Sequence, residues 1–249
     1  MITRHFAFLA VSVLAACSSL PSRLKPYRES PPLRLLAEVD RQVYTPASRG
    51  LQRMEADLFI DVAGFAEAKA RSKGPLWVLV HFRWENGAAK YEPRNWPASA
   101  APLQKRVVAM LQGKEDDLVG RPFTDRLNGF RMTIEEGDDG LLWLIAAHPS
   151  DKERRLRLGI DGDFHVRRAV VEVNDREIAS EIAYGPGSPA VMTGVATQES
   201  GGQPAHTSVR YEYGRAGKFT LPTKLVYQTT VGQLPFPALT IEIKNIKVE

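Results

Sequence analysis

Cysteine is nearly absent from this chain of 249 residues, in which Cys17 is the single example. One cysteine excludes an intramolecular disulfide and leaves no second thiol to complete a zinc or redox site. Histidine is also scarce. The four histidines that follow Cys17 never occur at the spacing of a zinc-binding pair; they are His81, His148, His165 and His206. The sequence therefore predicts no metal site and no cofactor.

Motifs that carry catalysis are missing as well. The sequence has no Gly-x-Ser-x-Gly turn to present a nucleophilic serine, and Gly113-Lys114 lacks the other residues of a phosphate-binding loop. The acidic cluster at residues 135–139 lacks the alternating oxygen ligands of a calcium loop. We therefore predict no catalytic residues and no enzymatic activity. A hydrolase whose carboxylates are brought together by folding is the open alternative.

An excess of one charge sign is lacking too. The chain has 33 lysines and arginines against 29 aspartates and glutamates, for a net charge of +4. Basic and acidic residues are interleaved along the chain, whereas a protein that binds nucleic acid concentrates its basic residues on one surface. The charge pattern therefore argues against nucleic acid as a partner.

The N-terminus has the three parts of a secretory signal. Arg4 supplies a positive charge, residues 6–16 are apolar but too few to span a bilayer as a helix, and small residues precede Cys17. Residues 14–17 (LAAC) resemble the lipobox of bacterial lipoproteins. This resemblance implies that residues 1–16 are a signal peptide and that Cys17 receives a lipid. The alternatives are a secretory peptide with a chance cysteine and an N-terminal membrane anchor.

Lipidation would attach the protein to a membrane through Cys17, because two acyl chains are enough for stable anchoring. The next residue is the uncharged Ser18. An uncharged residue here resembles the pattern of lipoproteins that are sent on to the outer membrane. We therefore expect a lipid-anchored protein of the cell envelope, on the outer membrane and facing the periplasm.

Residues 17–32 contain four prolines and few apolar side chains, a composition typical of an extended tether. Residues 33–249 then have a length compatible with one domain. A helix is predicted at its start, because prolines suit the first turn and Leu35, Leu36, Val39 and Val43 share one helical face.

Apolar and polar residues alternate from residue 51 onward. In residues 54–62 every second side chain is apolar, as in a strand with one solvated face. Similar segments follow, separated by Asp-Gly, Asn-Asp and Gly-Gly pairs that favour hairpin turns. No strand–helix–strand alternation is present. The predicted fold class is α+β, mainly β: an antiparallel half-open β-barrel of roughly ten strands with covering or lid helices.

The predicted strands at residues 76–84 and 141–147 are apolar on both faces, so each face of these strands requires an apolar neighbour. We predict that their side chains and one from an earlier strand line a cavity for an acyl chain, namely Leu58, Trp77, Leu79, Trp143 and Ile145. A helix packed directly on the sheet is the alternative. Arg83 is the candidate anchor at the cavity mouth, with a surface salt bridge as its alternative. The candidate lid is a helix with an apolar stripe formed by Leu103, Val107, Met110 and Leu111.

Several segments resemble one family. They are residues 211–213 (YEY), 219–224 (FTLPTK), 239–248 (LTIEIKNIKV) and 80–84 (VHFRW), within an order of helix, long strand and hairpins. This resembles the lipoprotein-localisation carrier and receptor family (LolA/LolB-like) over most of residues 33–248. The resemblance implies an incomplete β-barrel, lidded by helices, whose concave face holds the acyl chains of a lipoprotein in transit. This chain departs from the pattern in its greater length, its early central helix and the lack of a clear exposed leucine loop.

The sequence thus predicts a membrane-anchored envelope lipoprotein that binds a lipid or acyl chain in an apolar concave cavity, with a role in lipoprotein sorting to the outer membrane. The alternative is a non-catalytic structural or interaction lipoprotein, with a protein partner in an envelope assembly or stress-sensing system. A cavity of about 300 Å³ or more would distinguish the first from the second.

Overall fold

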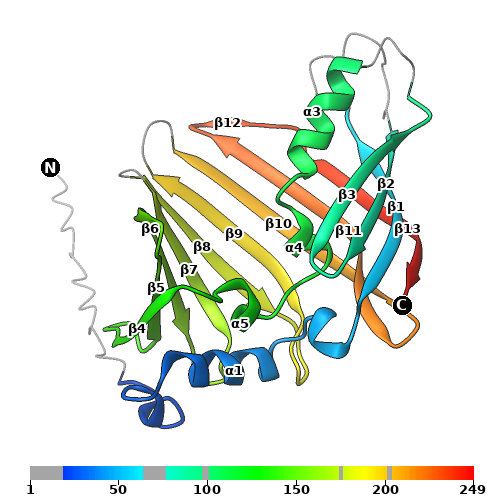
Figure 1. Cartoon of the computed structure of the whole chain (residues 1–249). Coiled ribbons are helices and arrows are strands. Elements are labelled where there is room, and N and C mark those ends of the chain that lie inside the picture. Colours follow the sequence, from blue (N-terminus) through cyan, green and yellow to red (C-terminus); the bar gives the residue numbers. More distant parts are fainter. Residues whose placement is uncertain (1–18, 64–76, 97–100, 174–175, 201–203) are drawn as a thin grey trace, which may run out of the picture.

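The computed structural model describes residues 19–63, 77–96, 101–173, 176–200 and 204–249 (Figure 1). The expected signal peptide and Cys17 lie outside these residues. Within the described residues, thirteen strands and four α-helices form a fold that is mainly antiparallel β. The predicted α+β, mainly β class is therefore confirmed.

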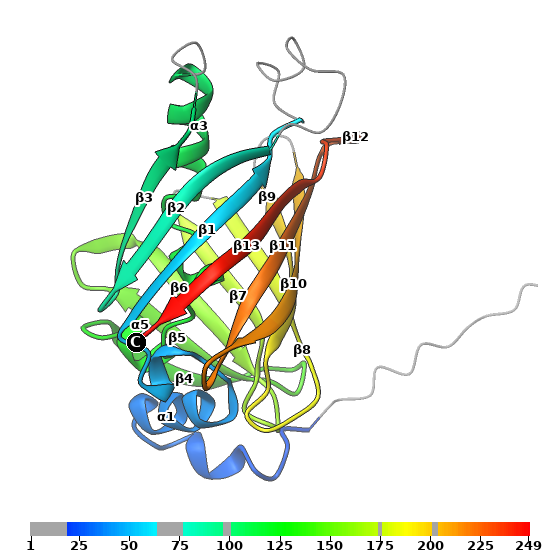
Figure 2. The same ribbon diagram turned by 90° about the vertical axis from the view of Figure 1, so that its right-hand side faces the viewer.

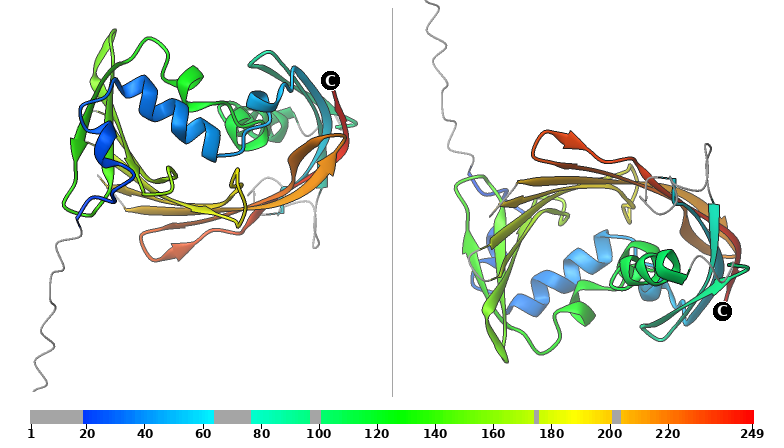
Figure 3. Two further views of the ribbon diagram at one scale, coloured as in Figure 1. Left: turned by 90° about the horizontal axis from the view of Figure 1, so that it is seen from below. Right: turned by 90° about the horizontal axis from the view of Figure 1, so that it is seen from above.

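All the strands belong to one sheet. In chain order they are β1 (Arg53–Asp61), β2 (Trp77–Glu85), β3 (Ala88–Arg94), β4 (Arg131–Glu136), β5 (Leu142–His148), β6 (Asp151–Ile160), β7 (Val166–Val173), β8 (Arg176–Tyr184), β9 (Met192–Ser200), β10 (Ala205–Ala216), β11 (Phe219–Val231), β12 (Leu234–Pro235) and β13 (Leu239–Val248). Their spatial order is β3-β2-β1-β13-β11-β10-β9-β8-β7-β6-β5-β4, with β12 paired to β11 beside this path. The sheet is curved but open, with β3 and β4 as its edges (Figure 3).

The prediction of roughly ten strands was too low, because the strands it omitted have weak apolar patterns. β3 lies at an edge and contains Pro93, which a central strand would not accept. Its side chains are alternately exposed and half-buried. β12 has only two residues, both exposed.

The helices lie on the concave side of the sheet (Figure 3). They are α1 (Pro32–Gln42), α3 (Ala101–Leu111), α4 (Glu115–Leu118) and α5 (Phe123–Arg126). Helix α1 begins with proline and buries Leu35, Leu36 and Val39. Its Asp40 accepts hydrogen bonds from the backbone N–H groups of Phe123 (2.6 Å) and Thr124 (3.0 Å), which joins α5 to α1. None of the helices of the described residues lies over the convex side of β1, β13 and β11 (Figure 2).

The buried apolar side chains form two separate clusters rather than one core. The first cluster joins α3 and α4 to β1, β2, β11 and β13. The second joins α1 to β5, β6 and the start of β7. The middle of the concave face, on β7 to β10, lies between them and contributes mostly half-buried side chains.

The expected tether is shorter than predicted. Leu20 and Leu24 are 3% and 0% exposed and belong to the second cluster. The Tyr27 ring, in the 3₁₀ turn Lys25–Tyr27, meets Phe164 edge-on at 5.3 Å between centroids. The folded part therefore begins by Leu20 and not at residue 33, because these apolar residues dock a segment that its prolines alone would leave extended.

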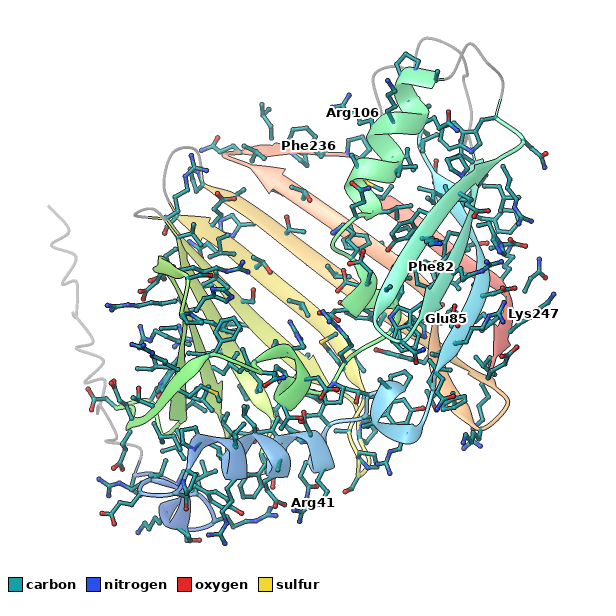
Figure 4. The ribbon with its side chains drawn as sticks, in the orientation of Figure 1. Arg41, Phe82, Glu85, Arg106, Phe236 and Lys247 are labelled. Carbon is teal, nitrogen blue, oxygen red and sulfur yellow. The ribbon has the colours of Figure 1, made fainter. Side chains whose placement is uncertain are left out.

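One hairpin tip exposes large apolar side chains. Leu234 and Phe236 are 72% and 54% exposed, at the end of the sheet opposite α1 (Figure 4). An exposed leucine that the sequence did not reveal is thus present between β11 and β13. No helix among the described residues is long and apolar enough to cross a membrane.

Candidate functional site

A cavity of about 310 Å³ lies between the concave face and the segments that cover one end of it. Its floor is formed by β6 to β11. Its cover consists of residues 43–46, helix α4, residues 118–123 and helix α5. The cavity therefore occupies the seam between the two packed clusters.

The floor of the cavity is apolar. It includes Leu156 and Leu158 of β6, Val171 of β7, Ile182 of β8 and Val195 of β9. Ile182 and Val195 are directly opposite each other across β8 and β9. Ile182 packs against the second cluster and Val195 against the first. The floor thus links the two clusters, and Ile182 and Val195 remain half-buried between them.

Helix α4 is fastened to the sheet through one carboxylate. Asp117 accepts hydrogen bonds from the hydroxyl groups of Tyr211 (2.8 Å) and Tyr227 (2.9 Å). Both tyrosines are nearly buried, and burial followed by the nearby Asp117 charge raises the pKa of each phenol. The Lys114 ammonium lies 4.5 Å from the centroid of the Tyr227 ring. This arrangement holds α4 over the cavity.

The rim of the cavity carries two arginines on a shared carboxylate. Arg121 donates through Nε to Asp116 Oδ1 (2.8 Å), and Arg126 Nε lies 3.3 Å from Asp116 Oδ2. The hydrogen bond to Asp116 raises the pKa of Arg121. The Arg126 guanidinium also lies 5.3 Å from the centroid of the Phe123 ring. These charged groups are partly exposed, so the rim is polar where the floor is not.

Residues 43–46 close another side of the cavity. The Tyr44 N–H donates to the Ala190 carbonyl (2.8 Å), and the Tyr44 hydroxyl accepts from the Thr220 N–H (2.8 Å). Thr45 is 6% exposed, and its hydroxyl has no hydrogen-bond partner among the described residues. The cover is therefore well attached, with one buried polar group left unsatisfied.

The residues predicted to form the cavity do not line it. Leu58 is fully buried, but in the first cluster. Trp77 and Leu79 alternate with the buried Val80 and Phe82, so they face the convex side of β2. Trp77 is 40% exposed there.

Trp143 and Ile145 also face away from the cavity. Their neighbours Leu142, Leu144 and Ala146 are fully buried and face the second cluster. The Trp143 ring lies on the other face, 4.9 Å from the Arg157 guanidinium and 5.7 Å from that of Arg168. Strand β5 is apolar on both faces without a second apolar layer on its convex side. The side chains of Arg157 and Arg168 cover Trp143 there instead.

The predicted mouth anchor and lid have other positions. Arg83 forms an ion pair with Glu55 (3.0 Å) on the convex face, which was the alternative interpretation. Leu103, Val107 and Leu111 of α3 are buried in the first cluster, and Met110 packs against it. Helix α3 is therefore part of a filled core and does not line the cavity.

A polar group on the convex face was not predicted. His81 Nδ1 lies 3.0 Å from Asp57 Oδ1, and Asn245 Nδ2 donates to Asp57 Oδ2 (2.8 Å). These hydrogen bonds, that from Asn245 first, lower the pKa of Asp57. Across the described residues, no group of three or more His, Cys, Asp or Glu side chains could hold a metal ion.

Comparison with known proteins adds little to this geometry. No protein-family model matches the chain, and no curated protein matches it. Among solved structures, the crystal structure of MucB in complex with MucA(peri) is similar at 10% identity and a TM-score of 0.17, covering 87% of this chain and 97% of that one. A TM-score this low carries no argument about fold or function.

Proposed function

We propose that this protein is a non-catalytic, membrane-tethered envelope lipoprotein that binds a lipid or acyl chain on its concave face. The cavity of about 310 Å³ over an apolar floor is the observation that carries this proposal. A largely apolar hollow of this volume is at the lower end of the range of roughly 300–1,000 Å³ for small-molecule sites.

The division of the core supports the same function. Each cluster is closed by its own helix, α3 for the first and α1 for the second. The floor between them includes Ile182 and Val195, which are only half-buried. An inserted acyl chain would bury this surface at about 25 cal/mol per Å², so binding would be driven by the hydrophobic effect.

The tether and the cellular role belong to the same proposal. Residues 14–17 support lipidation at Cys17, and the uncharged Ser18 supports the outer membrane. The resemblance to the LolA/LolB-like family adds lipoprotein sorting as the process. If the binding experiment fails, the alternative function is favoured: a structural lipoprotein with a filled core that acts through a protein partner.

Two neighbouring substitutions on β8 provide the test. Ile182→Trp fills the cavity, whereas Ala183→Trp places the same ring on the exposed convex face. We expect wild type and Ala183→Trp to bind a fluorescent fatty acid equally, and Ile182→Trp to bind at least tenfold more weakly. Thermal melts verify folding, and Val195→Phe on the facing strand is a second cavity-filling variant. Equal binding by folded Ile182→Trp, Val195→Phe and Ala183→Trp would contradict the proposal, as would no binding by wild type.

A further inference from the structure

The polar rim of the cavity indicates which lipid it accepts. We propose that the ligand is a single-chain amphiphile with an anionic head group, and that Arg121 and Arg126 hold this head. The inference rests on the proposed function, since it names the ligand of the same cavity.

Hydrogen-bond donors exceed acceptors at this rim. Each guanidinium has five N–H donors and no acceptor. Asp116 accepts from Arg121 Nε (2.8 Å) and Nη2 (3.4 Å), and its second oxygen lies 3.3 Å from Arg126 Nε. Most of the donors of Arg126 therefore have no acceptor among the described residues. A carboxylate or phosphate oxygen pair matches the fork of a guanidinium.

Charged groups of both signs surround the rim. Arg121 and Arg126 share the carboxylate of Asp116, and the negative charges of Glu115 and Asp125 also raise the pKa of Arg121. Asp117 is the other carboxylate in the cavity wall. Its two oxygens are already occupied by the hydroxyls of Tyr211 and Tyr227, which belong to the first cluster. The anionic head would thus meet the arginines and not Asp117.

The exposed fractions of the rim and floor side chains indicate how the ligand is oriented in the cavity. The side chains of Arg121 and Arg126 are 41% and 42% exposed. The floor residues Ile182 and Val195 are apolar and half-buried. An amphiphile would keep its charged head at the solvated rim and extend its chain over β6 to β9.

The volume limits the number of chains. At about 310 Å³ the cavity is at the lower end of the range of roughly 300–1,000 Å³ for small-molecule sites. One acyl chain fits such a volume better than the two chains of a phospholipid. The ligand class is therefore a fatty acid or a single-chain phosphate ester, and this inference replaces the acylated lipoprotein as the ligand of the proposed function.

The test compares ligands that differ only in the head. Dodecanoate, dodecyl phosphate and dodecanol are titrated into the protein by displacement of a fluorescent fatty acid. We expect both anions to bind at least tenfold more tightly than the alcohol. The stronger of the two anions identifies the head as carboxylate or phosphate. Dioleoyl phosphatidic acid, with two chains, should bind at least tenfold more weakly than the better anion.

Substitutions connect this preference to the rim. Arg126→Gln should weaken binding of the better anion about tenfold or more and leave dodecanol within about twofold. Arg121→Gln is the second variant. Arg210→Gln, an exposed arginine on the convex face of β10, is the matched control and should change neither ligand. Thermal melts of all three variants establish that they remain folded.

The outcomes separate this inference from the proposed function. If anions and alcohol bind equally, or if Arg126→Gln and Arg121→Gln weaken both ligand types alike, the head-group inference is overturned while lipid binding stands. Tight binding of phosphatidic acid overturns the single-chain inference. If none of the ligands binds, the proposed function itself fails.

Discussion

Replacing Asp117 with alanine should destabilise the protein, because two buried hydroxyl groups lose their acceptor. Tyr211 and Tyr227 are 5% and 6% exposed, so water cannot readily replace the carboxylate. An unsatisfied buried hydrogen-bonding group costs about 1–3 kcal/mol. Two such groups give an expected loss of about 2–6 kcal/mol in the free energy of unfolding for Asp117→Ala.

A second background isolates this effect from other consequences of the substitution. With Tyr211→Phe and Tyr227→Phe in place, Asp117→Ala no longer leaves a hydroxyl unpaired. The same substitution should then cost about 1 kcal/mol or less, since removing both partners is nearly neutral. Residues in one hydrogen-bond network are expected to show such coupling.

Urea unfolding followed by tryptophan fluorescence measures both losses. The loosened α4 should also weaken binding of a fluorescent fatty acid, because Asp117 and Leu118 are in the wall of the cavity. The reasoning is refuted if Asp117→Ala costs less than about 1 kcal/mol in the wild-type background. It is equally refuted if the cost is the same in both backgrounds, since the hydroxyls would then have no part in it.

Three further predictions concern the core, the convex face and pH. Val107→Asp should lower the free energy of unfolding by about 3 kcal/mol or more in denaturant titrations, because Val107 is fully buried. The control Lys105→Asp, at an exposed position of the same helix, should change it by no more than about 0.5 kcal/mol. A small effect of Val107→Asp would restore the lid interpretation of α3. Gly159→Ala should cost about 1–3 kcal/mol, because a Cβ there would lie 2.8 Å from Leu141 Cδ1 and 3.2 Å from the Trp143 ring, and a thermal melt unchanged from wild type would contradict this packing. Burial raises the pKa of five of the seven tyrosines, so the unfolded state loses phenolic protons first and stability should fall as pH rises above about 10. In an alkaline titration the phenolate absorbance of these five should appear only with unfolding, and its appearance in folded protein would count against their burial.

Periodicity along the chain was a good guide to the elements. In β1 the predicted apolar positions, including Leu58 and Ile60, are the buried ones, and the intervening residues are half-buried. Leu35, Leu36 and Val39 are buried as predicted for α1. Local spacing decides which side chains share a face, and one solvated face makes the choice of the buried side unambiguous.

The cavity could not be read from the same patterns. Its walls combine residues 43–46, helices α4 and α5 and strands β6 to β11, which only the folded sheet brings together. In β5 both faces are apolar, so periodicity does not reveal whether Trp143 or Leu144 faces the helices. The arginines that cover Trp143 come from β6 and β7. Ile182 and Val195 were overlooked because each sits in a strand with few large apolar side chains.

The two rim arginines could not be predicted from the sequence for a different reason. Arg121 lies between α4 and α5, and Arg126 is the last residue of α5; each helix has only four residues. Their shared contact with Asp116 depends on how α4 and α5 are held, through Asp117 and Asp40 respectively. No spacing rule connects these residues before the fold is known.

Native mass spectrometry should detect the proposed ligand on protein that carries Cys17→Ser, which prevents the proposed lipidation and permits purification without detergent. We expect one bound single-chain lipid per molecule in this protein and with Ala183→Trp added, and its loss when Ile182→Trp is added without a change in melting temperature. If the Cys17→Ser protein carries no lipid, and acquires none when incubated with dodecanoate, the proposed lipid binding is wrong.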